Sequence, residues 1–328
     1  MVNRPLLTQS IPFWTQILCN VRVKWIGRVY DLSETTEKPT KGKNRIPDFP
    51  GALKATCLDW SRRGDGHHGV FLIEAVNKKK YIVKCYGRKR SKWGEILTIP
   101  GNYLTGRSSS RPLTRFNTEK EVLHTWRRHG FDVFQEPNDF PPIMITPPHL
   151  VFEYINGRTL LSYFADPHIG KDDKIATLKS FIPEWGRRHH LAMKSKNRLL
   201  IQEHPSFKHV YMNNDGRLIF FDFETVYTPM HSLPSLIGRE IAGYVRSLYK
   251  VIFPGEFNDF LDVLIREYPY REYLSYPFYY FFRHPNPLTK LLYALDRRLP
   301  RHQKRHSKYP VARLLKDRLG RTGGAGDP

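Results

Sequence analysis

The sequence predicts an α+β fold of two lobes: a small antiparallel β-sheet with one helix, followed by a mostly helical part. Two observations lead to this prediction. Strand-like apolar runs separated by polar turns lie in the first third of the chain, and amphipathic helical segments fill the second half. The chain has 328 residues, which is long enough for one bilobal domain with a sizeable core. We divide it into an N-terminal extension and linker (1–50), an N-lobe (51–148), a hinge (149–157), a C-lobe (158–285) and a basic C-terminal tail (286–328).

The composition is that of a globular protein with a strongly basic surface. Hydrophobic residues make up 40% of the chain, and the formal net charge is +22. Such a charge favours an anionic partner: a nucleotide, a phosphorylated glycan, a nucleic acid or an acidic membrane surface. A solvated basic surface that binds nothing in particular is the alternative interpretation.

The cysteines and the N-terminus bear on the expected location. The chain has three cysteines, an odd number, without the spacing of a metal site, which indicates reduced thiols. Polar residues interrupt the early apolar stretch, so neither a signal peptide nor a membrane span is predicted. We therefore expect a cytoplasmic protein.

The predicted N-lobe begins with strands at 53–60, 70–76 and 81–86. The turn between the first two strands has a Gly-x-Gly-x-x-Gly pattern, and Lys84 follows it on the third strand among apolar neighbours. Glycines allow backbone N–H groups to approach phosphates closely, and a lysine supplies a point charge for them. The glycine turn and Lys84 together therefore indicate a phosphate site. The alternative is an ordinary hairpin turn and a lysine that faces solvent.

A basic segment rich in glycine and serine, 87–114, precedes the next helix and is a candidate substrate or anion loop. The apolar spacing predicts that helix over 116–129. A carboxylate on it is expected to pair with Lys84. Glu119 lies four residues before the apolar Leu123 and thus on the inward face, and Glu121 is the second candidate.

A hairpin is predicted in the second lobe from two apolar runs, 210–212 and 218–221, separated by Asn-Asn-Asp-Gly. The start of its first strand and the end of its second lie at the same edge. His204, His209 and Asp222 should therefore converge in space. This layout is typical of a phosphotransfer site.

Helices are predicted in the C-lobe at 172–193, with an interruption at Pro183, at 236–252 and at 257–265. The histidines of the basic stretch Arg187–His190 are expected to be solvated or satisfied in the core rather than to bind metal. The aromatic cluster 268–282 is expected to pack in the core rather than to stack on nucleic acid.

The predicted tail combines many basic residues with an apolar stripe made of Leu288, Leu291, Leu292 and Leu295. A basic amphipathic segment suits an anionic membrane surface. Nucleic acid is not expected as a partner, because no known nucleic-acid-binding motif accompanies the charge. The segment Gly320–Pro328 is expected to be disordered.

The order of these motifs resembles protein-kinase-like enzymes. Tyr81-Ile82-Val83-Lys84 resembles their Val-Ala-Ile-Lys, and Asp222-Phe223-Glu224 resembles their metal-binding Asp-Phe-Gly. His209 takes the place of a metal-binding Asn, which is similar to the lipopolysaccharide core kinases of the Kdo/WaaP type. His204 takes the place of the catalytic Asp, a departure from both groups.

The resemblance implies a site and its cofactors. ATP would bind with Mg²⁺ or Mn²⁺, the metal ion held by Asp222 and His209. The nucleotide would contact the glycine turn, the lysine with its carboxylate partner, and backbone groups of the hinge: Gly64, Gly66, Gly69, Lys84, Glu119, Glu153 and Ile155. The catalytic residues would be Lys84, Asp222 and His204.

The implied activity is ATP-dependent phosphoryl transfer to a sugar of lipopolysaccharide core, or to a similar phosphorylated or anionic glycan or glycolipid. The protein would then work at the inner membrane face. His204 could accept the acceptor's proton if a neighbour such as Glu203 held it. The alternative is an inactive pseudokinase that binds nucleotide or serves as a scaffold.

Overall fold

The computed structural model describes part of the chain, all of it within one of the chain's two units, Thr40–Pro328. The described residues are 49–60, 68–87, 108, 111–145, 147–229, 231–283, 287–299 and 306–323. Gly64 and Gly66 lie outside them, as do most of the segment 87–114 and nearly all of the extension 1–50.

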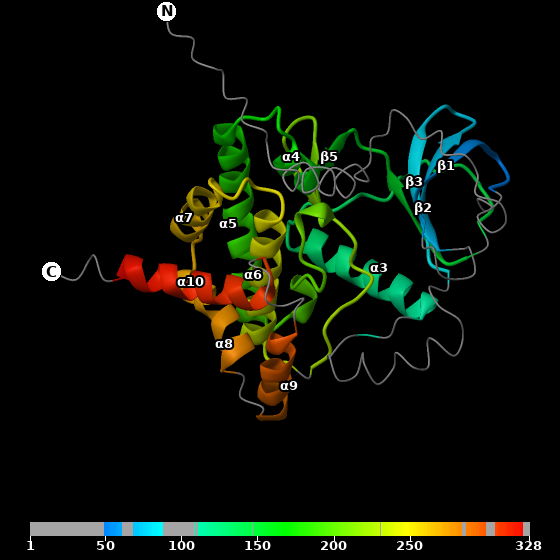
Figure 1. Ribbon diagram of the computed structural model, residues 1–328. Coiled ribbons are helices and arrows are strands. Elements are labelled where there is room, and N and C mark those ends of the chain that lie inside the picture. The colour runs from blue at the N-terminus through cyan, green and yellow to red at the C-terminus, as the bar shows by residue number, and fades with distance from the viewer. Residues whose placement is uncertain are drawn as a thin grey trace, which may run out of the picture. The chain divides into compact units, whose positions relative to one another are not determined.

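The first lobe is a four-stranded antiparallel sheet in the order β1-β2-β3-β4 (Figure 1). Its strands are β1 (Ala52–Trp60), β2 (Gly69–Ala75), β3 (Lys80–Cys85) and β4 (His149–Glu153). Side chains on β3 alternate between the two faces, as the strand period of two requires. Tyr81 and Val83 enter a small apolar cluster with Phe71 of β2. Lys84 therefore faces the opposite side, toward helix α3.

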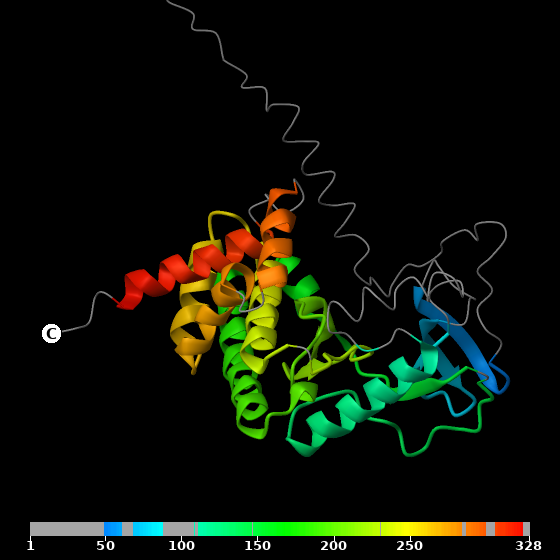
Figure 2. The same ribbon diagram turned by 90° about the horizontal axis from the view of Figure 1, so that it is seen from below.

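Helix α3 (Pro112–Arg128) lies beside this sheet, as both views show (Figures 1 and 2). It begins four residues before the predicted start, because Pro112 fits the first turn of a helix, where its missing N–H is not needed. It ends at Arg128, and Gly130, two residues later, has a φ of +73° that suits glycine. Glu119, Leu123 and Trp126 are buried on one face.

The second lobe contains a small sheet of β5 (Gly157–Thr159), β6 (Val210–Asn213) and β7 (Leu218–Phe220). The predicted turn between β6 and β7 is confirmed: Gly216 has a φ of +79°, and the Asn213 side chain accepts from the N–H of Asp215 at 3.1 Å. The helices are α4 (Leu160–Ala165), α5 (Lys171–Ser195), α6 (Leu233–Tyr249), α7 (Phe257–Glu267), α8 (Tyr276–Phe282), α9 (Pro287–Arg298) and α10 (Lys308–Gly323). Short 3-10 helices lie at Arg198–Leu200, Phe207–His209 and Arg271–Ser275.

Helix α5 corrects the predicted interruption, because it runs continuously through Pro183. Proline removes one hydrogen bond from a helix interior. Here Phe181, Ile182 and Trp185, on either side of it, are fully buried. Tertiary packing of these side chains offsets the local cost. The main apolar core of the lobe forms around them, with aromatic contacts from Phe181 to Tyr244 of α6.

The segment predicted as a basic tail contains two helices, α9 and α10. Helix α10 buries Tyr309, Val311 and Leu315. The expected disorder from Gly320 onward is wrong for residues 320–323, which continue this helix. The antiparallel sheet with its helix and the mostly helical second lobe confirm the predicted α+β fold. Within the described residues, no helix has the length and apolar character needed to cross a membrane.

Candidate functional site

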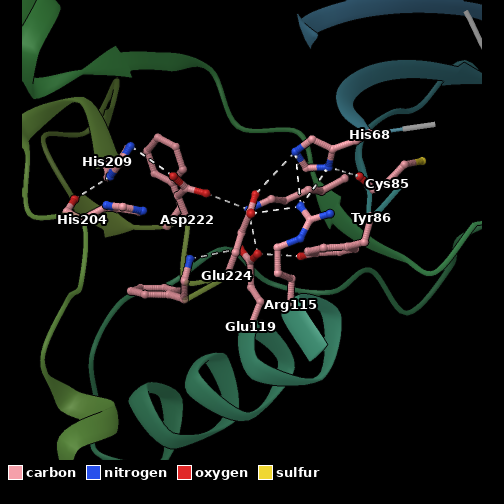
Figure 3. Close-up of polar contacts among 12 residues, drawn as sticks. His68, Cys85, Tyr86, Arg115, Glu119, His204, His209, Asp222 and Glu224 are labelled. Atoms are coloured by element: carbon pink, nitrogen blue, oxygen red, sulfur yellow. Dashed lines mark hydrogen bonds and ion pairs between the residues drawn. The ribbon is translucent and has the colours of Figure 1, made fainter. Parts of the chain in front are cut away.

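The side chain of Lys84 is the centre of a buried ion cluster between the two lobes. Figure 3 labels the carboxylates of this cluster, Glu119, Asp222 and Glu224. Its Nζ lies 2.6 Å from Glu119 Oε2, 2.9 Å from Asp222 Oδ1 and 3.4 Å from Glu224 Oε1. Burial by itself would lower the pKa of Lys84. The carboxylates of Asp222, Glu119 and Glu224 outweigh that effect and raise the pKa well above its ordinary value, so the ammonium stays charged.

Glu119 is the partner of Lys84 on α3, whereas Glu121 is exposed. The Oε2 atom of Glu119 also accepts a hydrogen bond from the Tyr86 hydroxyl at 2.6 Å. Its Oε1 accepts from the N–H of Phe223 at 3.4 Å. Burial raises the pKa of Glu119, against the opposing effect of Lys84. The choice of Glu119 from its helical position was therefore correct.

Asp222 connects the cluster to the second lobe. It follows β7 with a φ of +69°, a strained conformation that Asp tolerates better than most residues and that occurs often at functional sites. One carboxylate oxygen contacts Lys84, and the other lies 3.1 Å from Nε2 of His209. Asp222 keeps 28% of its side chain exposed, so it is the part of the cluster most open to a ligand.

His209 is buried and neutral. Its Nδ1 lies 2.7 Å from the carbonyl oxygen of His204, which can only accept a hydrogen bond, so Nδ1 carries the proton. Burial lowers the pKa of His209 to about 4 despite the opposing charge of Asp222. The lone pair of Nε2 therefore faces a carboxylate oxygen of Asp222. Two acceptors that face each other suit a cation, and a metal-binding histidine commonly has its other nitrogen bonded to a carbonyl.

His204 lies beside this pair, with its ring centroid 6.5 Å from that of His209. The sequence predicted Glu203 as a partner, and Nδ1 of His204 lies 2.8 Å from Glu203 Oε2. The Glu203 side chain is 1% exposed, and its other oxygen lies 3.3 Å from Arg239. Half of the His204 side chain is exposed, so solvent and ligands can reach a ring that lies next to a buried carboxylate, without the geometry of a hydrogen bond to it.

Sequence reasoning missed the contacts of Glu224. Its Oε2 lies 3.1 Å from Nη1 of Arg115, on the first turns of α3. Arg115 also donates to the carbonyl of Gly87 and contacts the ring of His68, next to the glycine turn. A signal did exist: Arg115 lies four residues before Glu119, on the same inward helix face.

Three carboxylates lie together in this cluster. Glu119, Asp222 and Glu224 each offer an oxygen within 4.8 Å of the others. Among the described residues, Lys84 and Arg115 contact them as permanent cations. The exposed part of Asp222 is where an added cation can reach the three carboxylates.

The contacts of the remaining predicted site residues say less about ligand binding. A Cβ on Gly69 would lie 2.8 Å from the Asp59 carbonyl oxygen, so glycine is needed here for close pairing of β1 and β2. In the hinge, the N–H of Glu153 donates to Gln135 at 3.0 Å. The carbonyl of Ile155 accepts from the Tyr211 hydroxyl at 3.1 Å. Their contact with a nucleotide base stays a prediction.

Comparisons with known proteins add little to this geometry. No protein-family model and no curated protein matches the chain. Among solved structures it is similar to the amicoumacin kinase hAmiN in complex with AMP-PNP, Ca²⁺ and Ami. The identity is 14% and the TM-score 0.36, over 92% of this chain and 95% of that chain. A likeness this weak does not bear on the chemistry of the site.

Proposed function

We propose that the chain is an ATP-dependent phosphotransferase. The observation that carries the proposal is the convergence on one buried lysine of a carboxylate from α3 and a carboxylate from the second lobe. Phosphoryl transfer needs positioned phosphates, neutralisation of their charge and a route for the acceptor's proton. The Lys84 cluster, the Asp222–His209 pair and His204 offer one group for each of these needs.

Asp222 and His209 would hold a divalent metal ion, which supplies positive charge to the phosphate oxygens when bound. Mg²⁺ prefers oxygen ligands, whereas an imidazole nitrogen also suits Mn²⁺. Lys84 would contact the phosphates directly, keeping its position through Glu119. The base of the bound nucleotide would reach the hinge near Glu153 and Ile155.

His204 would act as the general base. A proton on Nδ1 next to the Glu203 carboxylate leaves the lone pair on Nε2, the atom that would take the proton from the acceptor hydroxyl. The acceptor oxygen then bonds to the terminal phosphorus, and the bond from that phosphorus to its bridging oxygen breaks. General-base catalysis contributes roughly 10²- to 10⁴-fold to such a rate.

The acceptor we propose is a sugar of lipopolysaccharide core, or a similar anionic glycan or glycolipid, at the inner membrane face. This substrate class rests on the resemblance of the His209 motif and on agreement with the net charge of +22. Transfer to any other anionic alcohol would leave the phosphotransferase proposal intact.

An inactive pseudokinase is the second candidate, and Glu224 is the observation that favours it. Its carboxylate lies 3.4 Å from the Lys84 ammonium, on the cation that phosphates would use. If Glu224 does not give way, phosphates cannot approach Lys84.

The first experiment measures thermal unfolding with ATP or its non-hydrolysable analogue, with Mg²⁺, with Mn²⁺ and without metal. Ligand at one hundred times its dissociation constant should add about 2.7 kcal/mol of stability. Lys84→Met should abolish the shift of the midpoint. Lys80→Met, an exposed lysine on the same strand, is the matched control and should keep it. No shift in the wild-type protein under any condition would refute nucleotide binding.

The second experiment separates the two candidates by the rate of ATP turnover. In a phosphotransferase, His204→Asn should lower turnover roughly 10²-fold or more with nucleotide binding unchanged. Glu203→Gln should lower turnover less, because the histidine stays and only its neighbouring carboxylate is lost. A protein that binds nucleotide, with a turnover that neither substitution alters, is the pseudokinase.

A further inference from the structure

Helix α9 carries an exposed apolar stripe. Leu291 and Leu295 are 56% and 52% exposed, and Leu299, just past the helix end, is 42% exposed. Their spacing of four residues places the two helical leucines on one face. Isolated exposed leucines are ordinary on protein surfaces, but three that follow one another along an element are not.

The opposite face of α9 is fixed against α8 and α10. The Tyr293 hydroxyl donates to the Tyr280 hydroxyl at 2.6 Å, and Arg297 donates to the carbonyl of Phe281 at 3.1 Å. The Tyr309 hydroxyl of α10 donates to Asp296 at 2.8 Å. Both views place α9 beside α8 at the border of the helical lobe (Figures 1 and 2). This packing holds the leucines toward the outside.

The exposed charged residues of α9 itself are basic. Lys290 and Arg298 are exposed, and Arg298 lies seven residues after Leu291, on the same face. Asp296 is the acidic residue of α9, and it is turned to the packed face, where Lys308 lies 2.8 Å away. The outward face is therefore apolar and cationic, with its acid neutralised.

We propose that this face, formed by Lys290, Leu291, Leu295, Arg298 and Leu299, docks on the surface of an anionic lipid bilayer. Leucine side chains can enter the boundary between headgroups and acyl chains, while basic residues contact anionic headgroups. At 12 residues α9 is too short to cross a bilayer, so it lies on the surface. The surface uses no residue of the Lys84 cluster, so the inference does not depend on the proposed phosphotransfer.

The test is co-sedimentation of the full chain with vesicles of phosphatidylcholine alone and of phosphatidylcholine with phosphatidylglycerol. The wild-type protein should bind only the anionic vesicles. The double variant Leu291→Gln, Leu295→Gln should bind them at least tenfold more weakly. Lys290→Gln with Arg298→Gln should weaken binding and flatten its dependence on salt.

A matched control replaces two leucines of similar exposure in the first lobe. Leu53 and Leu113 are 60% and 59% exposed, and Leu53→Gln with Leu113→Gln should bind the vesicles like the wild-type protein. Thermal unfolding with nucleotide should be unchanged in the α9 variants, which shows that they are folded and keeps this test separate from that of the nucleotide site.

Three results would overturn the proposal. One is full vesicle binding by the α9 leucine variant, which would make the interaction purely electrostatic. Another is an equal loss in the Leu53/Leu113 control. The third is a dimer in sedimentation equilibrium that the leucine variant abolishes, without vesicle binding by the wild-type protein, since α9 would then contact a second copy of the chain.

Discussion

Two buried ion clusters of this protein differ in how far they are closed to solvent. Around Lys84, three carboxylates lie together, and Asp222 is partly exposed. Between α5 and α6, the single carboxylate of Glu240 faces Arg188 and His189, and all three side chains are fully buried. The first cluster joins elements of both lobes, whereas the second lies inside one.

Both oxygens of the Glu240 carboxylate accept hydrogen bonds from protein groups. Arg188 contacts both oxygens of Glu240 and donates to the carbonyl of Leu200 at 2.5 Å. The N–H of Gln202 donates to Glu240 at 2.9 Å. Burial would raise the pKa of Glu240, but Arg188 and His189 outweigh it and lower the pKa to about 2. The ionised Glu240 carboxylate therefore holds the backbone at Gln202, two residues before His204.

The difference indicates which cluster binds ligands. A fully buried cluster whose carboxylate is paired within the protein offers no exposed group to a ligand. A cluster of three adjacent carboxylates, one of them partly exposed, can be stabilised by an added cation. Perturbed titratable groups alone would not distinguish the two sites, because both have them.

The largest loss of stability is expected from Arg188→Met, which leaves Glu240 buried without its main cation. Breaking a buried ion pair in this way costs about 3–5 kcal/mol. Chemical denaturation measures this loss of unfolding free energy. The neighbouring Arg187, partly exposed and paired with Glu184, is the control, and Arg187→Met should cost about 1 kcal/mol or less. Equal costs would mean that burial of the cluster is unimportant.

Lys84→Met should cost less, about 3 kcal/mol near pH 8, because Asp222 is partly solvated. The uncompensated carboxylates would have raised pKa values in the folded state. Such groups contribute stability below their pKa and lose it as the pH rises, so the variant should recover part of its loss near pH 5. Denaturation at both pH values tests this, and an equal loss at both would contradict it.

His209→Gln should change the pH dependence of stability. The folded pKa of about 4 lies below the ordinary 6.5, so wild-type stability is present above pH 6.5 and is lost as the pH falls toward 4. Between pH 7 and 5 the loss from this group is about 2 kcal/mol, and the variant should lack it. His189 titrates in the same direction and stays in both proteins. Exposed His124→Gln is the control and should behave like the wild-type protein.

The fold and the ligand-facing half of the site were predictable because their signals are local. Period-two runs predicted the strands, and Asn-Asn-Asp-Gly predicted the turn that brings His209 and Asp222 to one edge. The position of Glu119 relative to Leu123 chose the partner of Lys84. In each of these cases neighbouring residues hold the whole signal.

The charge balance was not predictable, since it depends on contacts between distant residues. Arg115 and Glu224 lie 109 positions apart, and Arg188 and Glu240 lie 52 apart. Helix α5 likewise continues through Pro183 because of packing by residues of other elements. Basic residues in α10 suggested an exposed tail, yet Tyr309 and Leu315 bury one side of it.

The smallest effect on stability is expected for Asp222→Asn, and Glu240→Gln makes the same chemical change in the other cluster. Asp222→Asn removes one of three neighbouring negative charges, and Asn also tolerates a φ of +69°, so stability should change by less than about 1 kcal/mol, in either direction. Glu240→Gln leaves Arg188 buried without a counter-charge and should cost about 3 kcal/mol or more.

Ligand binding should show the reverse order. Asp222→Asn should abolish the metal-dependent stabilisation by nucleotide, whereas Glu240→Gln, once folded at lower temperature, should keep it. Denaturation without ligand and thermal shifts with Mn²⁺ and nucleotide measure the two effects in the same proteins. If Asp222→Asn instead destabilised the free protein as much as Glu240→Gln, then Asp222 would be a structural ion-pair partner, and its partly exposed carboxylate would not mark a ligand site.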